Sequence, residues 1–187
     1  RYFKKIEQIK ADAFILDLED SVPQSFKKSA RNIISDNLHS GHLADKQIII
    51  RINELDKGEL LEDLDAVLHK DVLALMPAKI YSKQDMAFFD EVLNQYEARL
   101  GLTKGHFKLI PLIETLLAFE NINDIANSTS RLIALAFGGE DYLNELGGSH
   151  GEHDHTFNYP RTKIAIASKA AGLQAIDTPY LDVNDLD

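Results

Sequence analysis

The chain has 187 residues, of which 44% are hydrophobic and 27% charged, as expected for a globular protein that can bury one core. Its formal net charge of -10 argues against nucleic acid or an acidic membrane surface as a partner. It has no Cys, which excludes disulfides, thiol catalysis and Cys-based zinc sites. No apolar run approaches the roughly 18 residues of a membrane span, and the N-terminus lacks an apolar signal core, so we expect a cytoplasmic protein.

Apolar runs alternate with amphipathic stretches along the whole chain. In chain order we expect the end of a helix at 1–10, a strand at 13–18, a helix at 24–38, a strand at 47–52, a helix at 58–69, a strand at 72–76, a helix at 82–99, a strand at 107–113, a helix at 115–127, a strand at 132–137, a helix at 160–171 and a short strand at 173–176. Continuous apolar strands separated by helices predict a parallel sheet that is covered on both faces.

Two architectures fit this alternation, an open doubly wound sheet and a (β/α)8 barrel. No G-x-G-x-x-G motif follows the first strand, which weakens the dinucleotide-binding version of the open sheet. Charged motifs after four different strands favour the barrel, because a barrel gathers all its strand ends around one mouth. Six strands fall short of eight, so we expect a single β/α-barrel domain over residues 1–187 that lacks its first and last β/α units.

One polar loop interrupts this pattern. Residues 147–159 contain no apolar run, and we expect them to form a flexible loop of lid-like length. The loop contains three histidines, His150, His153 and His155. Their loose spacing is more typical of a solvated loop than of a zinc site.

Two carboxylates are the best metal candidates. Glu114 and Asp141 each stand just past an apolar strand, and the two strands are neighbours in the predicted order. A hard cation such as Mg2+ takes one or two carboxylates and completes its shell with water and substrate oxygens. The alternative is that Glu114 is a helix N-terminal charge and Asp141 a helix N-cap.

An arginine interrupts the Ile-rich strand at 47–52. Arg51 would be costly there unless it were paired, and its planar guanidinium suits a carboxylate. It could hold a substrate carboxylate or thioester oxygen, and it could also pair with Asp17 or Glu19 of the preceding strand. Inward carboxylates at this strand end would orient Arg51 or hydrogen-bond metal waters, whereas Asp20 with Ser21 could simply cap the next helix.

A basic turn follows this acidic cluster. Lys27, Lys28 and Arg31 lie within one turn of the helix expected at 24–38. They could hold the phosphates of a cofactor handle, with Lys27 as the candidate, although a solvated helix face is the simpler interpretation.

Taken together, these segments resemble the citrate lyase beta subunit / malyl-CoA lyase family, the HpcH/HpaI aldolase-like group. The resemblance covers nearly the whole chain in order. Its motifs are Ile15–Pro23 followed by Lys27 and Ala30-Arg31, then Arg51-Ile52-Asn53, Ile113-Glu114-Thr115, Phe137-Gly138-Gly139-Glu140-Asp141, and Ala170–Asp177.

The resemblance implies a (β/α)8 TIM barrel of the phosphoenolpyruvate-binding superfamily that assembles as a homotrimer or larger oligomer. It implies Mg2+ held by Glu114 and Asp141, and Arg51 in contact with the substrate. The remaining residues expected in the site are Glu19 and Asp20, acting in catalysis with Arg51, and Gly138, Gly139 and Glu140, contacting the substrate. Compared with the family, we expect the first strand and the C-terminal region, which often supplies an acid/base and a lid, to lie outside this sequence.

The implied activity is reversible cleavage of a 3-hydroxyacyl thioester, such as citryl-, malyl- or citramalyl-CoA, to acetyl-CoA and a 2-oxo acid. The thioester could be carried by CoA or by an acyl carrier protein. Two alternatives remain open. One is an aldolase that acts on free 2-oxo acids without CoA, and the other is a non-catalytic lyase subunit.

Overall fold

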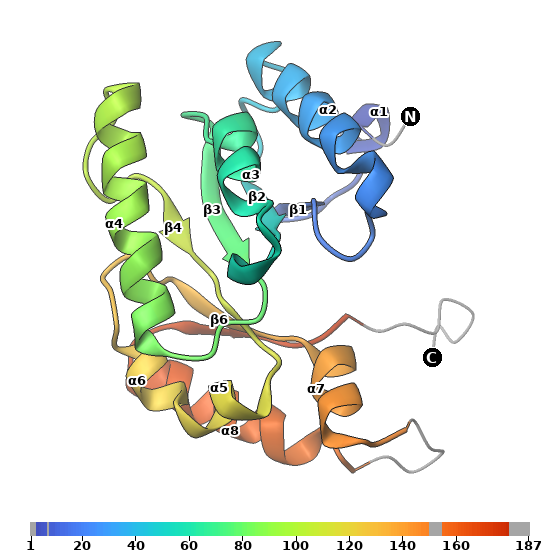
Figure 1. Ribbon diagram of the computed structural model, residues 1–187, viewed down its shortest axis with the longest axis vertical. Helices are drawn as coiled ribbons and strands as arrows, with labels where there is room; N and C mark the ends of the chain where they lie inside the picture. The colour runs from blue at the N-terminus through green and yellow to red at the C-terminus, as the bar shows by residue number, and fades with distance from the viewer. Residues whose placement is uncertain (1–2, 7, 150–154, 180–187) are drawn as a thin grey trace.

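The structure is a computed structural model that describes residues 3–6, 8–149 and 155–179 (Figure 1). Its strands form two parallel sheets, one in the order β1-β2-β3-β4 and the other in the order β5-β6-β7. The strands are β1 (Phe14–Asp17), β2 (Ile48–Ile52), β3 (Val72–Pro77), β4 (Lys108–Leu109), β5 (Leu112–Ile113), β6 (Ala134–Phe137) and β7 (Gln174–Ile176). The helices are α1 (Phe3–Ile6), α2 (Lys27–His39), α3 (Leu60–Val67), α4 (Lys83–Leu100), α5 (Leu116–Glu120), α6 (Ile122–Ala126), α7 (Gly139–Leu146) and α8 (Asn158–Ala170), with short 3-10 helices η1 (Gln24–Phe26) and η2 (Leu55–Lys57).

The strand expected at 107–113 is divided into β4 and β5, which corrects the prediction. The amide N of Ile110 still donates to Leu75 O of β3, but Pro111 has no N–H to continue that ladder. The carbonyl O of Pro111 instead accepts from Ala136 N of β6. One chain segment therefore leaves the first sheet and enters the second, and a bridge between Leu109 and Leu132 joins the two sheets at this point.

The helices differ from the prediction in two places and agree with it at the long helix α4. The helix expected at 115–127 is interrupted at Asn121, which separates α5 from α6. The helix α7 was not predicted, because it begins at Gly139 directly after Gly138 and its apolar face is short. The long helix α4 begins after Ser82 as expected, with a capping box formed by Ser82 and Asp85.

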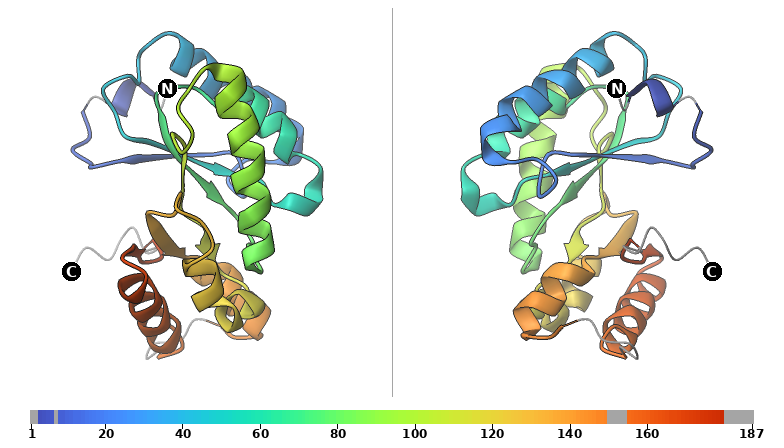
Figure 2. Two further views of the ribbon diagram at one scale, coloured as in Figure 1. Left: turned by 90° about the vertical axis from the view of Figure 1, so that its left-hand side faces the viewer. Right: turned by 90° about the vertical axis from the view of Figure 1, so that its right-hand side faces the viewer.

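The two faces of the sheets are covered differently. Side chains from α2 to α8 pack with one face of the strands in a single apolar cluster that runs from Ile6 to Ala167. The opposite face forms a second cluster of buried residues, Ile49, Ala74, Met76, Ala78, Ile110, Leu112, Ala134 and Ala136. Among the described residues no helix contributes to this second cluster, so the helices cover one face and the strands' own side chains bury the other. Figures 1 and 2 show the helices outside and the strands inside.

The described strands do not close into a barrel. β1 lies at one edge of the first sheet and β7 at one edge of the second. An apolar groove of about 440 Å³ runs along β1, and its lining includes Phe3, Ile15 and Ile33. None of the helices in the described part of the chain is both long enough and apolar enough to span a membrane.

A buried ion pair ties α4 to the segment that precedes β6. The guanidinium of Arg131 donates to both carboxylate oxygens of Glu97, over 2.6 and 2.8 Å, and to Asp90 over 2.5 Å. Arg131 and Glu97 are each only 1% exposed. Since both charges are out of water, removing one partner leaves the other unpaired in the core.

We therefore expect Arg131→Met to lower the free energy of unfolding by about 3–5 kcal/mol, as for other broken buried pairs. Lys83→Met is the matched control, because it removes an ion pair to Asp124 whose side chains are both more than half exposed. That change should cost less than about 1 kcal/mol. Denaturant unfolding followed by circular dichroism measures both values, and equal losses would contradict a structural role for the buried pair.

Candidate active site

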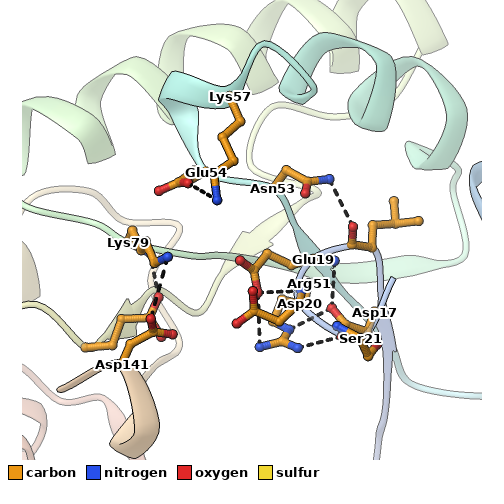
Figure 3. A network of polar contacts seen from close by, with 12 residues as sticks. Asp17, Glu19, Asp20, Ser21, Arg51, Asn53, Glu54, Lys57, Lys79 and Asp141 are labelled. Atoms are coloured by element: carbon orange, nitrogen blue, oxygen red, sulfur yellow. Dashed lines mark hydrogen bonds and ion pairs between the residues drawn. The ribbon is translucent and has the colours of Figure 1, made fainter. Parts of the chain in front are cut away.

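The charged motifs come together at the carboxyl ends of the strands, as expected of a parallel sheet (Figure 3). Asp17 is the last residue of β1, and Glu19 follows it by two residues. Arg51 lies in β2 directly beside Asp17, because the two are paired in the parallel register. Glu114 follows β5, and Asp141 lies in the first turn of α7, which follows β6.

Arg51 is held by two carboxylates. Its Nε and Nη2 donate to the two oxygens of Asp17 over 2.7 and 2.5 Å, and its Nη1 lies 3.4 Å from Glu19 Oε2. Burial alone would raise the pKa of Asp17, but hydrogen bonds from Arg51, from Ser21 and from the amide of Glu19 outweigh it and hold this pKa at about 2. The predicted pairing with the preceding strand is confirmed, and it fixes the guanidinium in one orientation.

Glu19 and Asp20 differ in their surroundings. Glu19 is only 4% exposed, and its Oε2 accepts a hydrogen bond from the amide of Asp20 over 2.7 Å. Burial raises the pKa of Glu19, and the neighbouring charge of Asp20 raises it further against the opposing effects of Arg51 and the Asp20 amide. Asp20 itself is exposed. Only Glu19 therefore belongs to the buried wall of the site.

Glu114 is a nearly buried carboxylate, 3% exposed. Its Oε1 accepts a hydrogen bond from the backbone amide of Lys79 over 2.7 Å. Burial, helped by the negative charges of Asp141 and Glu19, raises the pKa of Glu114 to about 7. A buried carboxylate that lies near other carboxylates needs a cation to balance its negative charge. Metal ligands are commonly found in such an environment.

Gly138 and Gly139 shape the wall next to Glu114. A Cβ at residue 138 would overlap Oε2 of Glu114 and would lie 2.5 Å from its Cβ, so only glycine fits there. The amide of Gly139 donates to Thr178 Oγ1 over 3.2 Å, which ties the start of α7 to the segment after β7. Glu140, the next residue, is exposed in the first turn of α7.

Lys79 is a site residue that the sequence reasoning missed. It follows β3 by two residues and adopts the left-handed region at φ 49°, which is uncommon for a residue with a side chain. Its Nζ lies 3.6 Å from Asp141 Oδ1, and its amide binds Glu114. The rule that selected Glu19 and Glu114, a charge just past a strand that ends at the mouth, also selects Lys79.

The two carboxylates suit a divalent cation that is also bound by substrate. Glu114 and Asp141 contact the same residue, Lys79, whose ammonium places a positive charge between strand ends at the mouth. Over the described ranges, no three or more His, Asp and Glu side chains are arranged to hold a metal ion. Mg2+ does not need such a set, because it is commonly bound by one or two carboxylates plus waters and substrate oxygens. Residues 150–154 of the histidine loop lie outside the described residues.

Lys27 has a different position from the one expected. It is 8% exposed, and its ammonium donates to Leu18 O, Glu19 O and Asn53 Oδ1 over 2.6–2.8 Å. These three bonds use all the hydrogens of the ammonium, so in this arrangement Lys27 has none for a cofactor phosphate. Arg31 is 4% exposed and is paired with Glu59, Glu62 and Asp63, so the solvated-face interpretation is wrong for both residues.

Asn53 connects these internal charges to the site. Its side-chain amide donates to Leu18 O over 3.0 Å and to Asp63 Oδ2 over 2.7 Å. Asp63 in turn receives Arg31 Nε over 2.6 Å. The network fastens the loop after β1 to the end of β2, and this loop positions Glu19 beside Arg51. In the sequence, Asn53 stood out only as part of the Arg51-Ile52-Asn53 motif, which does not indicate this internal role.

Comparison with known proteins gives consistent matches over most of the chain. The model of the HpcH/HpaI aldolase/citrate lyase family matches residues 2–187. The citrate lyase subunit beta of Haemophilus influenzae is 32% identical over 176 residues, which are 94% of this chain and 60% of that protein. The mitochondrial citramalyl-CoA lyase of Rattus norvegicus is 31% identical over 194 residues, covering 98% of this chain and 57% of that protein.

A solved structure supports the same likeness. The crystal structure of the protein CitE from Mycobacterium tuberculosis in complex with magnesium, acetoacetate and coenzyme A matches with a TM-score of 0.72 and 26% identity. The match covers 98% of this chain and 64% of that one. The chain thus spans 57–60% of the length of the two curated relatives above.

The raised pKa of Glu114 predicts a pH dependence of stability in the metal-free protein. Because burial favours the neutral carboxyl, its contribution to stability is fully present below the ordinary value of 4.5 and is lost as the pH rises through about 7. Glu114→Gln keeps the hydrogen-bond acceptor for Lys79 but cannot ionise. Relative to the wild type, this variant should gain about 3 kcal/mol of stability between pH about 5 and about 8.5.

Denaturant unfolding in EDTA at the two pH values measures this gain. Glu120→Gln is the control, because Glu120 is an exposed carboxylate at the end of α5. The stability of this control should follow the wild type at both pH values. Parallel pH curves for the wild type and Glu114→Gln would show that Glu114 ionises normally.

Proposed function

The chain belongs to the HpcH/HpaI aldolase/citrate lyase family, and from this premise we propose that the whole protein is a Mg2+-dependent carbon–carbon lyase acting on a 3-hydroxyacyl thioester. The observation that supports this most directly is the meeting of Glu114 and Asp141 around Lys79, beside the Arg51–Glu19 pair. This arrangement offers a site for a cation and a separate fixed positive charge. Cleavage to two carbonyl products needs the cation and the fixed positive charge, because negative charge develops on the hydroxyl oxygen of the substrate and on its thioester oxygen.

Glu114 and Asp141 would hold the metal with the carboxylate and neighbouring oxygen of the 2-oxo acid. When bound, Mg2+ supplies a Lewis acid that polarises this oxygen. The relatives point to the substrate class, because the named proteins include a citrate lyase subunit and a citramalyl-CoA lyase. The matching Mycobacterium tuberculosis protein was crystallised with magnesium, acetoacetate and coenzyme A. Citryl-, malyl- and citramalyl-CoA are therefore the candidate substrates.

Arg51 would bind the thioester oxygen. When the carbon–carbon bond breaks, its electron pair passes to the acyl thioester, which becomes an enolate with negative charge on that oxygen. Arg51 is held in place by Asp17 before any substrate arrives, so its charge needs no reorientation. Its side chain is 24% exposed, so part of the guanidinium can be reached by a ligand.

The acidic and glycine residues complete the proposed site. Glu19 and Asp20 would accept hydrogen bonds from water in the mouth and so help to orient it. Gly138, Gly139 and Glu140 stand at the start of α7 beside Glu114, and from this position they would contact the substrate. We assign no cofactor phosphate to Lys27, because its ammonium is bonded within the protein.

We further propose that the two sheets are neighbouring parts of one barrel wall in a single domain. All described helices pack on one face, the opposite face forms its own cluster, and β1 and β7 are the outermost strands of their sheets in the part of the chain that the structure describes. A structure of the whole protein should show a further strand paired with β1. A helix covering that edge instead would contradict the barrel. A trimeric or larger assembly and a cytoplasmic location stay predictions.

The proposed activity is tested by giving the whole protein citryl-, malyl- and citramalyl-CoA, with Mg2+ or with EDTA, and measuring acetyl-CoA. We expect Mg2+-dependent cleavage of one of the three. Glu114→Gln should lower the rate by at least about 100-fold, because metal stabilisation of the developing charge is worth several kcal/mol. Glu120→Gln should retain the wild-type rate.

The alternatives give different results in the same assay. Cleavage of free hydroxy acids without a thioester would indicate an aldolase of 2-oxo acids. If only a thioester on an acyl carrier protein is cleaved, the carrier is that protein and not CoA. No cleavage of any substrate by a protein that still binds Mg2+ would favour a non-catalytic subunit and overturn the proposal.

A further inference from the structure

Lys79 contacts both carboxylates of the proposed metal site with different groups. Its backbone amide donates to Glu114 Oε1 over 2.7 Å, and its ammonium lies 3.6 Å from Asp141 Oδ1. The left-handed φ of 49° is what lets one residue point its amide and its side chain at two strand ends. A divalent cation bound by Glu114 and Asp141 would share Asp141 with this ammonium. The two positive charges would then repel each other at short range.

A small cavity beside Lys79 offers the ammonium another place. It has a volume of about 80 Å³ and is lined by Glu54, Leu55, Asp56, Lys79, Tyr81 and Asp85. A water molecule needs roughly 30 Å³ of liquid volume, so the cavity has room for an ammonium group. Three of the lining residues are acidic, and Glu54 is close enough to attract the Lys79 charge already. Figure 3 shows Glu54 and Lys57 on one side of Lys79 and Asp141 on the other.

On the basis of the proposed metal site, we propose that Lys79 is an internal counter-ion that the metal displaces. In the metal-free protein its ammonium pairs with Asp141 and partly neutralises that carboxylate. When a divalent cation binds Glu114 and Asp141, the ammonium turns into the cavity next to Glu54. The backbone hydrogen bond to Glu114 is unchanged in this movement, because only the side chain turns.

The counter-ion role predicts a change in metal affinity whose sign differs from that expected for other roles of Lys79. A displaced counter-ion competes with the metal, so its removal should tighten metal binding. A residue that merely holds Asp141 in position would weaken metal binding when removed. A residue that binds only substrate would leave metal affinity unchanged and would alter KM. The sign of the change in metal affinity therefore separates the three roles.

The experiment is a Mn2+ titration of the whole protein without substrate, followed by the EPR signal of free Mn2+. Lys79→Met should lower the Kd by about ten-fold, as expected from the loss of a unit charge close to a cation in a partly exposed site. Lys79→Arg keeps the charge and should stay within about three-fold of the wild type. Lys70→Met is the matched control, since it removes an ammonium paired with Asp71 just before β3, at the opposite ends of the strands, and it should also stay within about three-fold.

The cavity is tested by a double-mutant cycle. Glu54→Gln removes the acceptor for the displaced ammonium and should weaken Mn2+ binding in the wild-type background. In the Lys79→Met background the same change should have little effect. Equal effects in both backgrounds would show that Glu54 acts on the metal directly, and would overturn the proposed movement. Thermal unfolding by circular dichroism confirms that each variant is folded.

The outcomes also separate this inference from the proposed function. Wild-type binding of Mn2+ that Glu114→Gln abolishes supports the metal site on which the lyase proposal depends. With that result in hand, weaker or unchanged binding by Lys79→Met overturns the counter-ion role alone. A wild-type protein that does not bind Mn2+ overturns both.

Discussion

The parallel register that places Asp17 beside Arg51 is the constraint on which the rest of the site depends. These residues are direct neighbours in the β1–β2 ladder, so their side chains leave the sheet at the same level and on the same side. The ion pair between them orients the guanidinium, and Glu19, two residues further on, lies against its remaining edge. A shift of one residue in this register would turn the Arg51 side chain to the opposite face of the sheet and separate it from Asp17 and Glu19.

A set of buried polar contacts next to the site stabilises the loop that carries Glu19. Lys27 holds two carbonyls of the loop that bears Glu19, and Asn53 links that loop to Asp63 on α3. Arg31 neutralises Asp63 from α2. The positions that resembled a phosphate-binding turn in the sequence thus stabilise the loop from within. Stability and site geometry are coupled here, because the same buried bonds serve both.

Much of the fold could be predicted from apolar periodicity alone, since five of the six predicted strands and the long helices agree with the structure to within a few residues. The break at Pro111 could not, because it depends on which neighbour accepts the next hydrogen bond rather than on local preference. The helix α7 was missed for a related reason. Its start is set by contacts of Gly138 with Glu114 and of Gly139 with Thr178, which lie far away in the sequence.

Site residues could be predicted where a charged residue interrupts or directly follows an apolar strand segment, and were harder to predict elsewhere. Arg51 and Glu114 were conspicuous for that reason, and Arg51 has the carboxylate partners expected of it. Lys79 also follows a strand end, but its contacts with Glu114 and Asp141 depend on the fold, and its φ of 49° cannot be predicted from the sequence. Burial of Lys27 was equally hidden, since an exposed and a buried lysine on a helix look alike in sequence until their partners are known.

The contact between Gly138 and Glu114 has a consequence for how this chain can vary. The space that the Glu114 carboxylate occupies exists only because residue 138 has no side chain. Positions 114 and 138 therefore form one unit of variation, although they come from different strand ends. A lineage or a designed library can place a larger residue at 138 only after residue 114 has become shorter or has been reoriented. A change at 114 followed by a change at 138 will therefore be tolerated, and the reverse order will not.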